Sequence, residues 1–127
     1  MFWPEILALH GKWRGSKDAV VCGQERWSWS QFCAASHRFA NGLLERELKS
    51  GDRIAIVMSN GLPMVQAIFG AMAAGVVSVP INLSVNDEAL ATMLEDAGVK
   101  ALVVSADQHD RLVAMRSLLP DTLKLLI

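Results

Sequence analysis

Apolar residues recur at steps of three and four along one stretch of the chain, and this is the strongest pattern in the sequence. They are Phe32, Ala35, Phe39, Ala40, Leu43, Leu44 and Leu48. This spacing places them on one face of an amphipathic helix. Ser28 and Gln31 stand at the spacing of a capping box, so we expect the helix to begin there. Ser50 and Gly51 are expected to end it, with Gly51 in a left-handed conformation.

Two shorter patterns precede this helix. Pro4 stands before apolar residues at helical spacing, which predicts a short helix that packs on the surface of the body. Residues 18–22 and 26–29, separated by residues 23–25, are typical of a β-hairpin. Trp27 and Trp29 alternate on the second strand, so we expect their side chains to face opposite sides.

From residue 51 onward, strand and helix patterns alternate. The first strand, 54–57, is continuously apolar, as expected for a parallel strand covered on both faces. The predicted segments that follow are helix 62–74, strand 76–80, helix 86–97, strand 101–104, helix 107–119 and strand 123–127. Three successive βαβ units imply a parallel sheet with helices on both faces. The sequence therefore predicts a single α/β domain over 1–127, in which 1–50 supplies a helix, a hairpin and the long helix, and 51–127 supplies the repeated units.

Composition narrows the range of partners. A net charge of −1 over 127 residues gives no reason to expect nucleic acid or anionic lipid as a partner. Cys22 and Cys33 match no zinc spacing, and two cysteines are too few for a disulfide scaffold, so we expect a reduced, cytoplasmic setting. The longest apolar stretch, 65–80, falls short of the ~20 residues of a membrane span, and the N-terminus lacks the pattern of a signal peptide.

The loop after the first strand of the repeats stands where many nucleotide-binding proteins bind phosphate. Ser59, Asn60 and Gly61 link a strand to a helix, but a dinucleotide fingerprint requires several glycines there. Pro63 also removes one of the N–H groups that an anion would use. We therefore expect Ser59 or Asn60 to cap the helix, with Gly61 forming the bend.

Two further glycines have the spacing of a nucleotide-binding motif. Gly70 and Gly75 have the spacing of a Walker A loop, but Val76 and Val77 occupy the positions of its Lys and Ser/Thr. The pair also precedes a strand, whereas the motif follows one. We expect Gly70 to permit close helix packing and Gly75 to cap a helix.

Four residues near the start of the last helix have the residue types of a hydrolase triad. Ser105, Asp107, His109 and Asp110 supply suitable residue types, but within only six positions. We expect Ser105 to form a capping box with Gln108 and His109 to face solvent. Two acidic pairs, Asp87-Glu88 and Glu95-Asp96, are expected to be solvated. The residues alone therefore identify no catalytic, cofactor-binding or metal-ligating residue.

Five segments, in this order and spacing, carry a resemblance to a known family. They are residues 28–32, 51–60, 71–77, 79–82 and 88–98. Together they resemble the N-terminal portion of acyl- and aryl-CoA synthetases, members of the AMP-forming adenylating superfamily with luciferases and peptide-synthetase adenylation domains. The resemblance covers nearly the whole chain. It implies a parent ligase, with a role such as fatty acid metabolism, that uses ATP, Mg²⁺ and CoA to convert a carboxylic acid to an acyl-adenylate and then a thioester.

The motifs that carry this chemistry in the family lie downstream of the matching portion. They are a Ser/Thr/Gly-rich loop ending in lysine, an aromatic-Thr-Glu segment, an Asp for the ribose and a C-terminal lysine, and none is assigned to a residue of this chain. We therefore expect an N-terminal scaffold segment, either a cut piece or a short natural product, that is inactive alone. Its expected partners are the remaining subdomains, together with self-association through exposed apolar area or a sheet edge. The alternatives are a standalone interaction or regulatory module and, with less support, an independent nucleotide-binding domain.

One position departs from the family pattern. After a strand that ends like Pro80-Ile81-Asn82, many relatives continue with Pro-Arg, and that basic residue lies where the coenzyme approaches. Here Leu83 and Ser84 follow, so the role is not carried over to Ser84. Asn82 is expected to hydrogen-bond within the loop and shape it.

Overall fold

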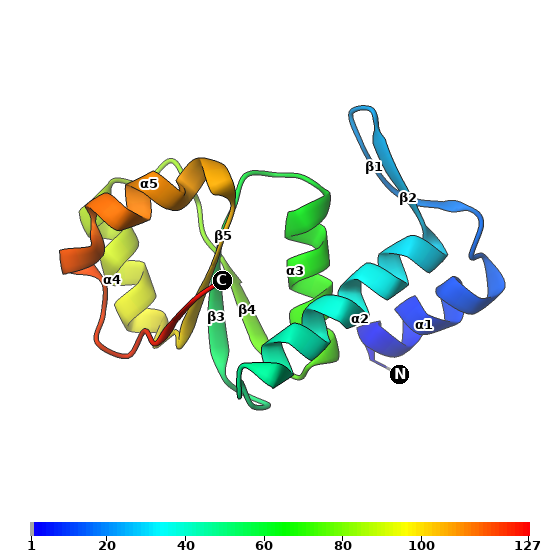
Figure 1. Cartoon of the computed structure of the whole chain (residues 1–127), viewed down its shortest axis with the longest axis horizontal. Helices are drawn as coiled ribbons and strands as arrows, with labels where there is room; N and C mark the ends of the chain where they lie inside the picture. Colours follow the sequence, from blue (N-terminus) through cyan, green and yellow to red (C-terminus); the bar gives the residue numbers. More distant parts are fainter. Residues whose placement is uncertain (1) are drawn as a thin grey trace.

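A computed structural model describes residues 2–127, with only the backbone placed for residues 125 and 126. The N-terminal part contains a helix, a hairpin and a long helix (Figure 1). Their bounds are α1 Trp3–Trp13, β1 Asp18–Cys22, β2 Glu25–Ser28 and α2 Trp29–Glu45. The hairpin turns at Gly23, whose φ of 60° is left-handed, and it projects from the body.

The rest of the chain forms a parallel sheet of four strands in the order β4-β3-β5-β6. The strands are β3 Arg53–Val57, β4 Val77–Pro80, β5 Ala101–Val104 and β6 Leu125–Leu126. The intervening helices are α3 Leu62–Ala73, α4 Asp87–Ala97 and α5 Ala106–Ala114, followed by a 3₁₀ helix at Arg116–Leu118. The α/β prediction is confirmed. No helix in the described part of the chain is both long and apolar enough to cross a bilayer.

Helices cover both faces of the sheet because the side chains of β3 alternate between them. Ile54 and Ile56 belong to a cluster with α2 and α3, whereas Ala55 and Val57 belong to one with α4 and α5. All four side chains are completely buried, which explains the continuous apolar run of this central strand. In Figure 1 the two helix layers lie on opposite sides of the strands.

The strand order creates a switch point between β3 and β5. The chain passes from β3 outward to β4 and then returns to β5 on the other side of β3. In such open sheets, ligands bind outside the carboxyl ends of the strands, where the direction of winding changes. In Figure 1 this is the upper edge of the sheet, from which the loops to α3 and α5 leave.

Helices α2 and α3 approach closely at Gly70. A Cβ at this position would lie 2.8 Å from the Cβ of Phe39 and 2.8 Å from the carbonyl oxygen of Ser36. The prediction that Gly70 permits close packing is confirmed. Gly75 also follows the end of α3 with a left-handed φ of 73°.

The predicted end of the long helix was wrong. Helix α2 ends at Glu45, and Glu47 takes the left-handed conformation, with φ 62°. Leu48 leaves the helix, folds into the core at 4% exposure and donates its backbone N–H to Leu43. Burial of Leu48 thus outweighs continuation of the helix. Gly51, with φ 86°, lies in the turn before β3.

The predicted placement of Trp29 on a strand was also wrong. The capping box of Ser28 and Gln31 is confirmed, with bonds of 3.3 and 2.8 Å, and it makes Trp29 the first residue of α2. The rings of Trp27 and Trp29 therefore both lie near Phe32, with centroid distances of 6.5 and 6.3 Å. They belong to one aromatic cluster and do not face opposite sides.

Near the C-terminus the elements are shorter than predicted. Helix α4 begins after the Asn86 cap and stops at Gly98, whose φ is 59°, as expected. The helix predicted over 107–119 is divided into α5 and the 3₁₀ helix, because Met115 turns into the core at 3% exposure. The last strand comprises two residues, where the pattern predicted five.

Candidate functional site

The carboxyl edge of the sheet is the candidate site, since it contains the switch point. Each neighbouring strand ends in a loop with polar side chains. Ser59 and Asn60 follow β3, Asn82 and Ser84 flank Leu83 after β4, and Ser105 follows β5. The topology thus brings together residues that are far apart in the sequence.

Two of these side chains, Ser59 and Ser105, together with Asp107 in the first turn of α5, form what we call the switch-point clasp. The hydroxyl of Ser59 donates to Oδ2 of Asp107 at 2.5 Å, and its backbone N–H donates to Oγ of Ser105 at 3.3 Å. The backbone N–H of Ser105 donates to the carbonyl of Val57 at 3.2 Å. The clasp therefore ties the end of β3 to the start of α5 across the switch point.

Formation of the clasp overturns two predicted helix caps. Gly61, not Ser59 or Asn60, occupies the N-cap position of α3, and no side chain caps that helix. Ser105 is the N-cap residue of α5, but its side chain accepts from Ser59 and not from the helix. Gln108 donates to Asp107 at 3.0 Å instead of closing a capping box. Long-range hydrogen bonds between loops have replaced the local ones.

Asp107 is strongly acidic in this setting. Hydrogen bonds from the side chains of Gln108, Ser105 and Ser59, in that order, hold the pKa of its carboxyl well below the usual range. An ionised carboxylate accepts hydrogen bonds but has no proton to donate. Asp107 is thus suited to holding the two serine loops, and it is unsuited to general-acid chemistry at neutral pH.

The arrangement does not match a hydrolase triad. Nδ1 of His109 lies 3.3 Å from Oδ1 of Asp110, its sequence neighbour, and the side chain is 57% exposed. Ser105 accepts its hydrogen bond from the backbone of Ser59. The prediction that His109 faces solvent is confirmed.

Two hollows flank the clasp. One, of about 330 Å³, lies between the loops after β3 and β4 and is lined by residues 58–60, Met64 and residues 81–84. Within it, Oδ1 of Asn82 accepts from the backbone N–H of Ser84 at 3.0 Å, so the predicted shaping role of Asn82 is confirmed. The other, of about 540 Å³, is lined by Ile127, by the end of β5 and by the start of α5, including His109. Neither lining contains Lys or Arg, so neither hollow offers a permanent positive charge to a phosphate.

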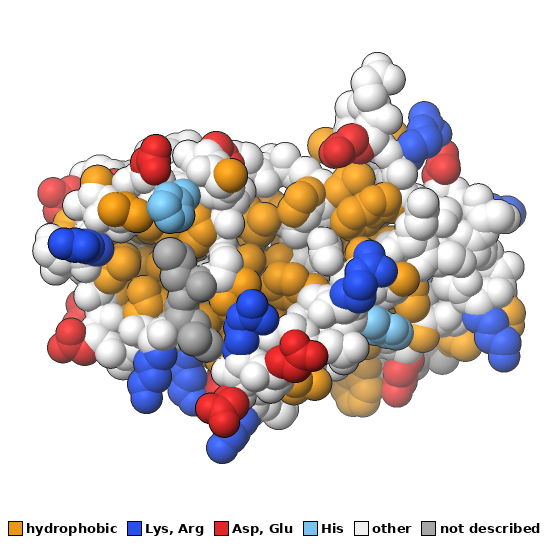
Figure 2. Space-filling model, viewed as in Figure 1, with side chains coloured by type: hydrophobic (Ala, Val, Ile, Leu, Met, Phe, Trp, Pro, Cys, Tyr) orange, Lys and Arg blue, Asp and Glu red, His pale blue; other side chains and the backbone are white. Residues whose placement is uncertain are grey.

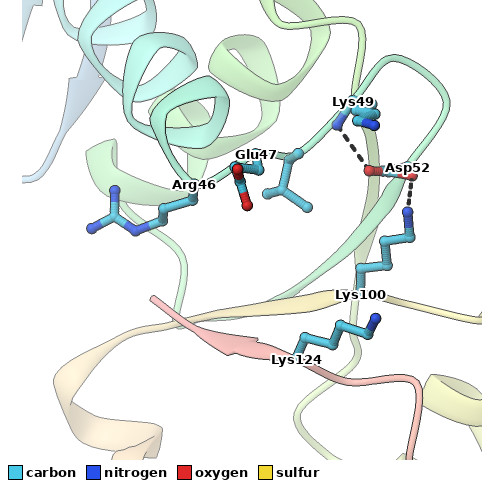
Figure 3. Close-up of a pocket in the computed structure, with 7 residues that line it drawn as sticks. Arg46, Glu47, Lys49, Asp52, Lys100 and Lys124 are labelled. Carbon is cyan, nitrogen blue, oxygen red and sulfur yellow. Dashed lines mark hydrogen bonds and ion pairs between the residues drawn. The ribbon is translucent and has the colours of Figure 1, made fainter.

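The positively charged pocket lies at the opposite, amino edge of the sheet (Figure 3). It has a volume of about 420 Å³, and its charged lining residues are Arg46, Glu47, Lys49, Asp52, Lys100 and Lys124. Asp52 accepts from Nζ of Lys100 at 2.6 Å and from the backbone N–H of Lys49 at 2.8 Å. The hydrogen bond from Lys100 is the largest cause of the lowered pKa of Asp52. We interpret this ion pair as a structural contact that joins the starts of β3 and β5.

Sequence reasoning missed Arg111, which organises the loop after β4. Its guanidinium donates to Oδ1 of Asp87 at 2.8 Å and to the carbonyls of Leu83 and Val85 at 3.0 and 2.5 Å. Asp87 was predicted to be solvated; its side chain is 45% exposed, and it also forms this ion pair with Arg111. The two residues are 24 positions apart, so no local spacing signals the pair. Between residues 2 and 127, no group of three or more His, Cys, Asp or Glu side chains is arranged to hold a metal ion.

Comparison with known proteins identifies the family. A family model described as AMP-binding enzyme matches residues 10–126. The chain belongs to the family of AMP-binding enzymes.

Curated relatives are distant and much longer. The chain is 27% identical over 104 residues to the medium/long-chain-fatty-acid–CoA/3-oxocholest-4-en-26-oate–CoA ligase of Mycobacterium tuberculosis, covering 82% of this chain and 18% of that protein. It is 29% identical over 87 residues to the anguibactin system regulator of Vibrio anguillarum, covering 68% of this chain and 8% of that protein. The chain thus spans less than a fifth of the length of either relative.

Solved structures agree with this assignment. The fatty acyl CoA synthetase of M. tuberculosis superposes with a TM-score of 0.90 at 26% identity, over 98% of this chain and 26% of that one. The N-terminal domain of FACL13 from the same organism gives a TM-score of 0.91 at 26% identity, over 98% of this chain and 32% of that one. The chain therefore resembles the N-terminal domain of AMP-forming acyl-CoA synthetases and corresponds to part of it.

Proposed function

We propose that the chain is the N-terminal scaffold segment of an AMP-forming acyl-CoA synthetase. The parent enzyme would activate a carboxylic acid with ATP and Mg²⁺ and transfer the acyl group to CoA. The observation that carries the proposal is the superposition of 98% of the chain on the M. tuberculosis fatty acyl CoA synthetase, of which it spans 26%. A neighbouring structure, the O-succinylbenzoate coenzyme A synthetase of Bacillus subtilis, is in complex with AMP.

The proposed role of the chain is to shape one wall of the active site. The residues that catalyse adenylation are expected on other parts of the parent enzyme. Within the clasp, Ser59 and Asp107 are hydrogen-bonded to each other. The hollow of about 330 Å³ beside the clasp is lined only by uncharged residues. A triphosphate requires cationic or backbone N–H donors. We therefore assign the loops after β3 and β4 a positioning role, with no catalytic residue in the chain.

The proposed partners are the remaining subdomains of the parent, within a cytoplasmic protein in which 1–127 folds as one unit. Large apolar side chains are exposed on α2, α5 and the 3₁₀ helix, with Leu44 at 51%, Val113 at 47% and Leu118 at 46%. Figure 2 shows hydrophobic side chains over the middle of this face of the molecule. Apolar area of this kind favours burial against another part of the enzyme.

Calorimetric titration of the chain with ATP, AMP and CoA tests the assignment. The scaffold role predicts no saturable heat at micromolar ligand, with the heat-unfolded chain as the blank. Micromolar binding of any of the three would instead support an independent nucleotide-binding domain. The reading frame beyond Ile127 tests whether the chain is part of a longer acyl-CoA synthetase. We expect it to encode a Ser/Thr/Gly-rich loop with a lysine, whereas a stop codon would favour a standalone interaction module.

A further inference from the structure

Helix α1 carries a second apolar surface besides the one that packs on the body. Phe2, Ile6, Leu9 and Trp13 recur at steps of four, three and four. At 100° per residue, Ile6, Leu9 and Trp13 fall within about 60° of one another around the helix axis, and Phe2 is the N-cap residue just before the helix. We call these four residues the α1 stripe. Such a narrow seam is typical of helices that pair lengthwise.

The stripe is accessible, because another side of α1 faces the body. Leu7, at 2% exposure, is buried, and Gly11 lies against Cys33 of α2. By contrast, Phe2 and Trp13 at the two ends of the stripe are 76% and 71% exposed, whereas Ile6 and Leu9 between them are of intermediate exposure. Hydrophobic side chains also reach the surface around α1 at the lower right of Figure 2. The two ends of the stripe are thus open to a partner, and its middle is accessible in part.

The charges beside the stripe fit a second copy of the same helix. Glu5 and Lys12 are both exposed and border the stripe on the same side. In an antiparallel pair, with the two-fold axis at the middle of the helix, Phe2 lies opposite Trp13 and Ile6 opposite Leu9. Residues that border the seam on the same side then face each other. Glu5 of each copy comes within two residues, about 3 Å along the axis, of the partner's Lys12.

We propose that α1 pairs antiparallel with α1 of a second copy, through the α1 stripe and two symmetric Glu5–Lys12 ion pairs. The interface is isologous, so it closes at a dimer. It is independent of the proposed synthetase role, because α1 lies away from the carboxyl edge of the sheet (Figure 1). Phe2, Ile6 and Leu9 also precede residues 10–126, the segment that the family model matches.

The dimer is expected to be weak. A pair of helices of 11 residues each buries less than the roughly 1,200 Å² of a stable interface. We expect a dissociation constant on the order of 100 µM. Sedimentation velocity from about 10 µM to 1 mM should therefore show a reversible, concentration-dependent shift from monomer to dimer.

Charge exchange gives a sharp test of the antiparallel register. Lys12→Glu alone places four acids across the seam, and Glu5→Lys alone places four bases, so each variant should dimerise at least several-fold more weakly. An equimolar mixture of the two variants restores both attractive pairs and should dimerise like the original chain. Because Glu5 also accepts the backbone N–H of Phe2 at 2.9 Å, circular dichroism must confirm that the Glu5→Lys helix is retained.

A matched pair of variants tests the stripe itself. Leu9→Gln should abolish the dimer, whereas Ala8→Gln, an exposed position outside the stripe, should leave it unchanged. A chain that stays monomeric at 1 mM would overturn the proposal. So would a dimer that survives Leu9→Gln, since it would form through another surface such as a sheet edge, or a mixture of charge variants that fails to associate.

Discussion

Replacing Gly70 by alanine separates the steric demand of the α2–α3 crossing from the intrinsic preference of a helix for alanine. Gly70 lies inside α3, where glycine costs roughly 1 kcal/mol relative to alanine. The added methyl group, however, would lie 2.8 Å from the backbone oxygen of Ser36 and 2.7 Å from Cδ1 of Phe39. A backbone oxygen in a packed helix cannot move aside without shifting α2 itself.

Overpacking of this kind costs about 1–3 kcal/mol, so the clash should exceed the propensity gain. We predict that Gly70→Ala lowers the free energy of unfolding by up to about 2 kcal/mol, or up to about 8 °C in Tm. The matched control is Gly42→Ala in α2. Its new Cβ would meet only a nitrogen of the flexible Arg46 side chain, at 3.5 Å. This variant should gain up to about 1 kcal/mol.

Urea denaturation followed by circular dichroism measures both variants. The reasoning requires the two alanines to change stability in opposite directions. If Gly70→Ala is as stable as Gly42→Ala, the close approach of the two helices is not a feature of the folded protein.

Three further predictions test other parts of the structure by the same denaturation assay. Ser36→Ala should raise the free energy of unfolding by about 0.5–1.5 kcal/mol, because the buried Ser36 hydroxyl lacks a hydrogen-bond partner among the described residues; a loss of stability would mean that it has one. Asp107→Asn should be less stable than the original chain at pH 7, and the difference should shrink as the pH falls from about 4 to 2, since a depressed pKa stabilises the fold only while the carboxylate is ionised; a constant difference would contradict the clasp. Leu94→Ala, at a completely buried position, should lower the free energy of unfolding by about 2–5 kcal/mol, whereas Met93→Ala, at 41% exposure, should lower it much less. Equal losses of stability would contradict the orientation of α4, in which Leu94 faces the core and Met93 faces solvent.

The sequence predicted the elements whose signals are local. The heptad-like pattern of α2, its Ser28 cap and the Gly98 stop of α4 each depend on residues within a few positions of one another. Alternating strands and helices then determined a parallel sheet through the handedness of the crossovers.

The site could not be predicted in the same way, because its contacts join residues far apart in the sequence. Ser59 and Asp107 are 48 positions apart, and local capping rules assigned each loop a different bonding pattern. The early end of α2 was missed for a similar reason, since burial of Leu48 depends on the sheet that α2 covers. Local rules thus failed where tertiary contacts compete with helix caps.

Exchange of labelled pyrophosphate into ATP tests the scaffold role most directly. The 127-residue chain would be assayed with Mg²⁺, ATP and a panel of carboxylic acids, beside a complete acyl-CoA synthetase as the positive control. We predict no exchange above the protein-free blank from the chain. Acid-dependent exchange by the purified chain would contradict the account, because it would place the groups that form the acyl-adenylate within these residues.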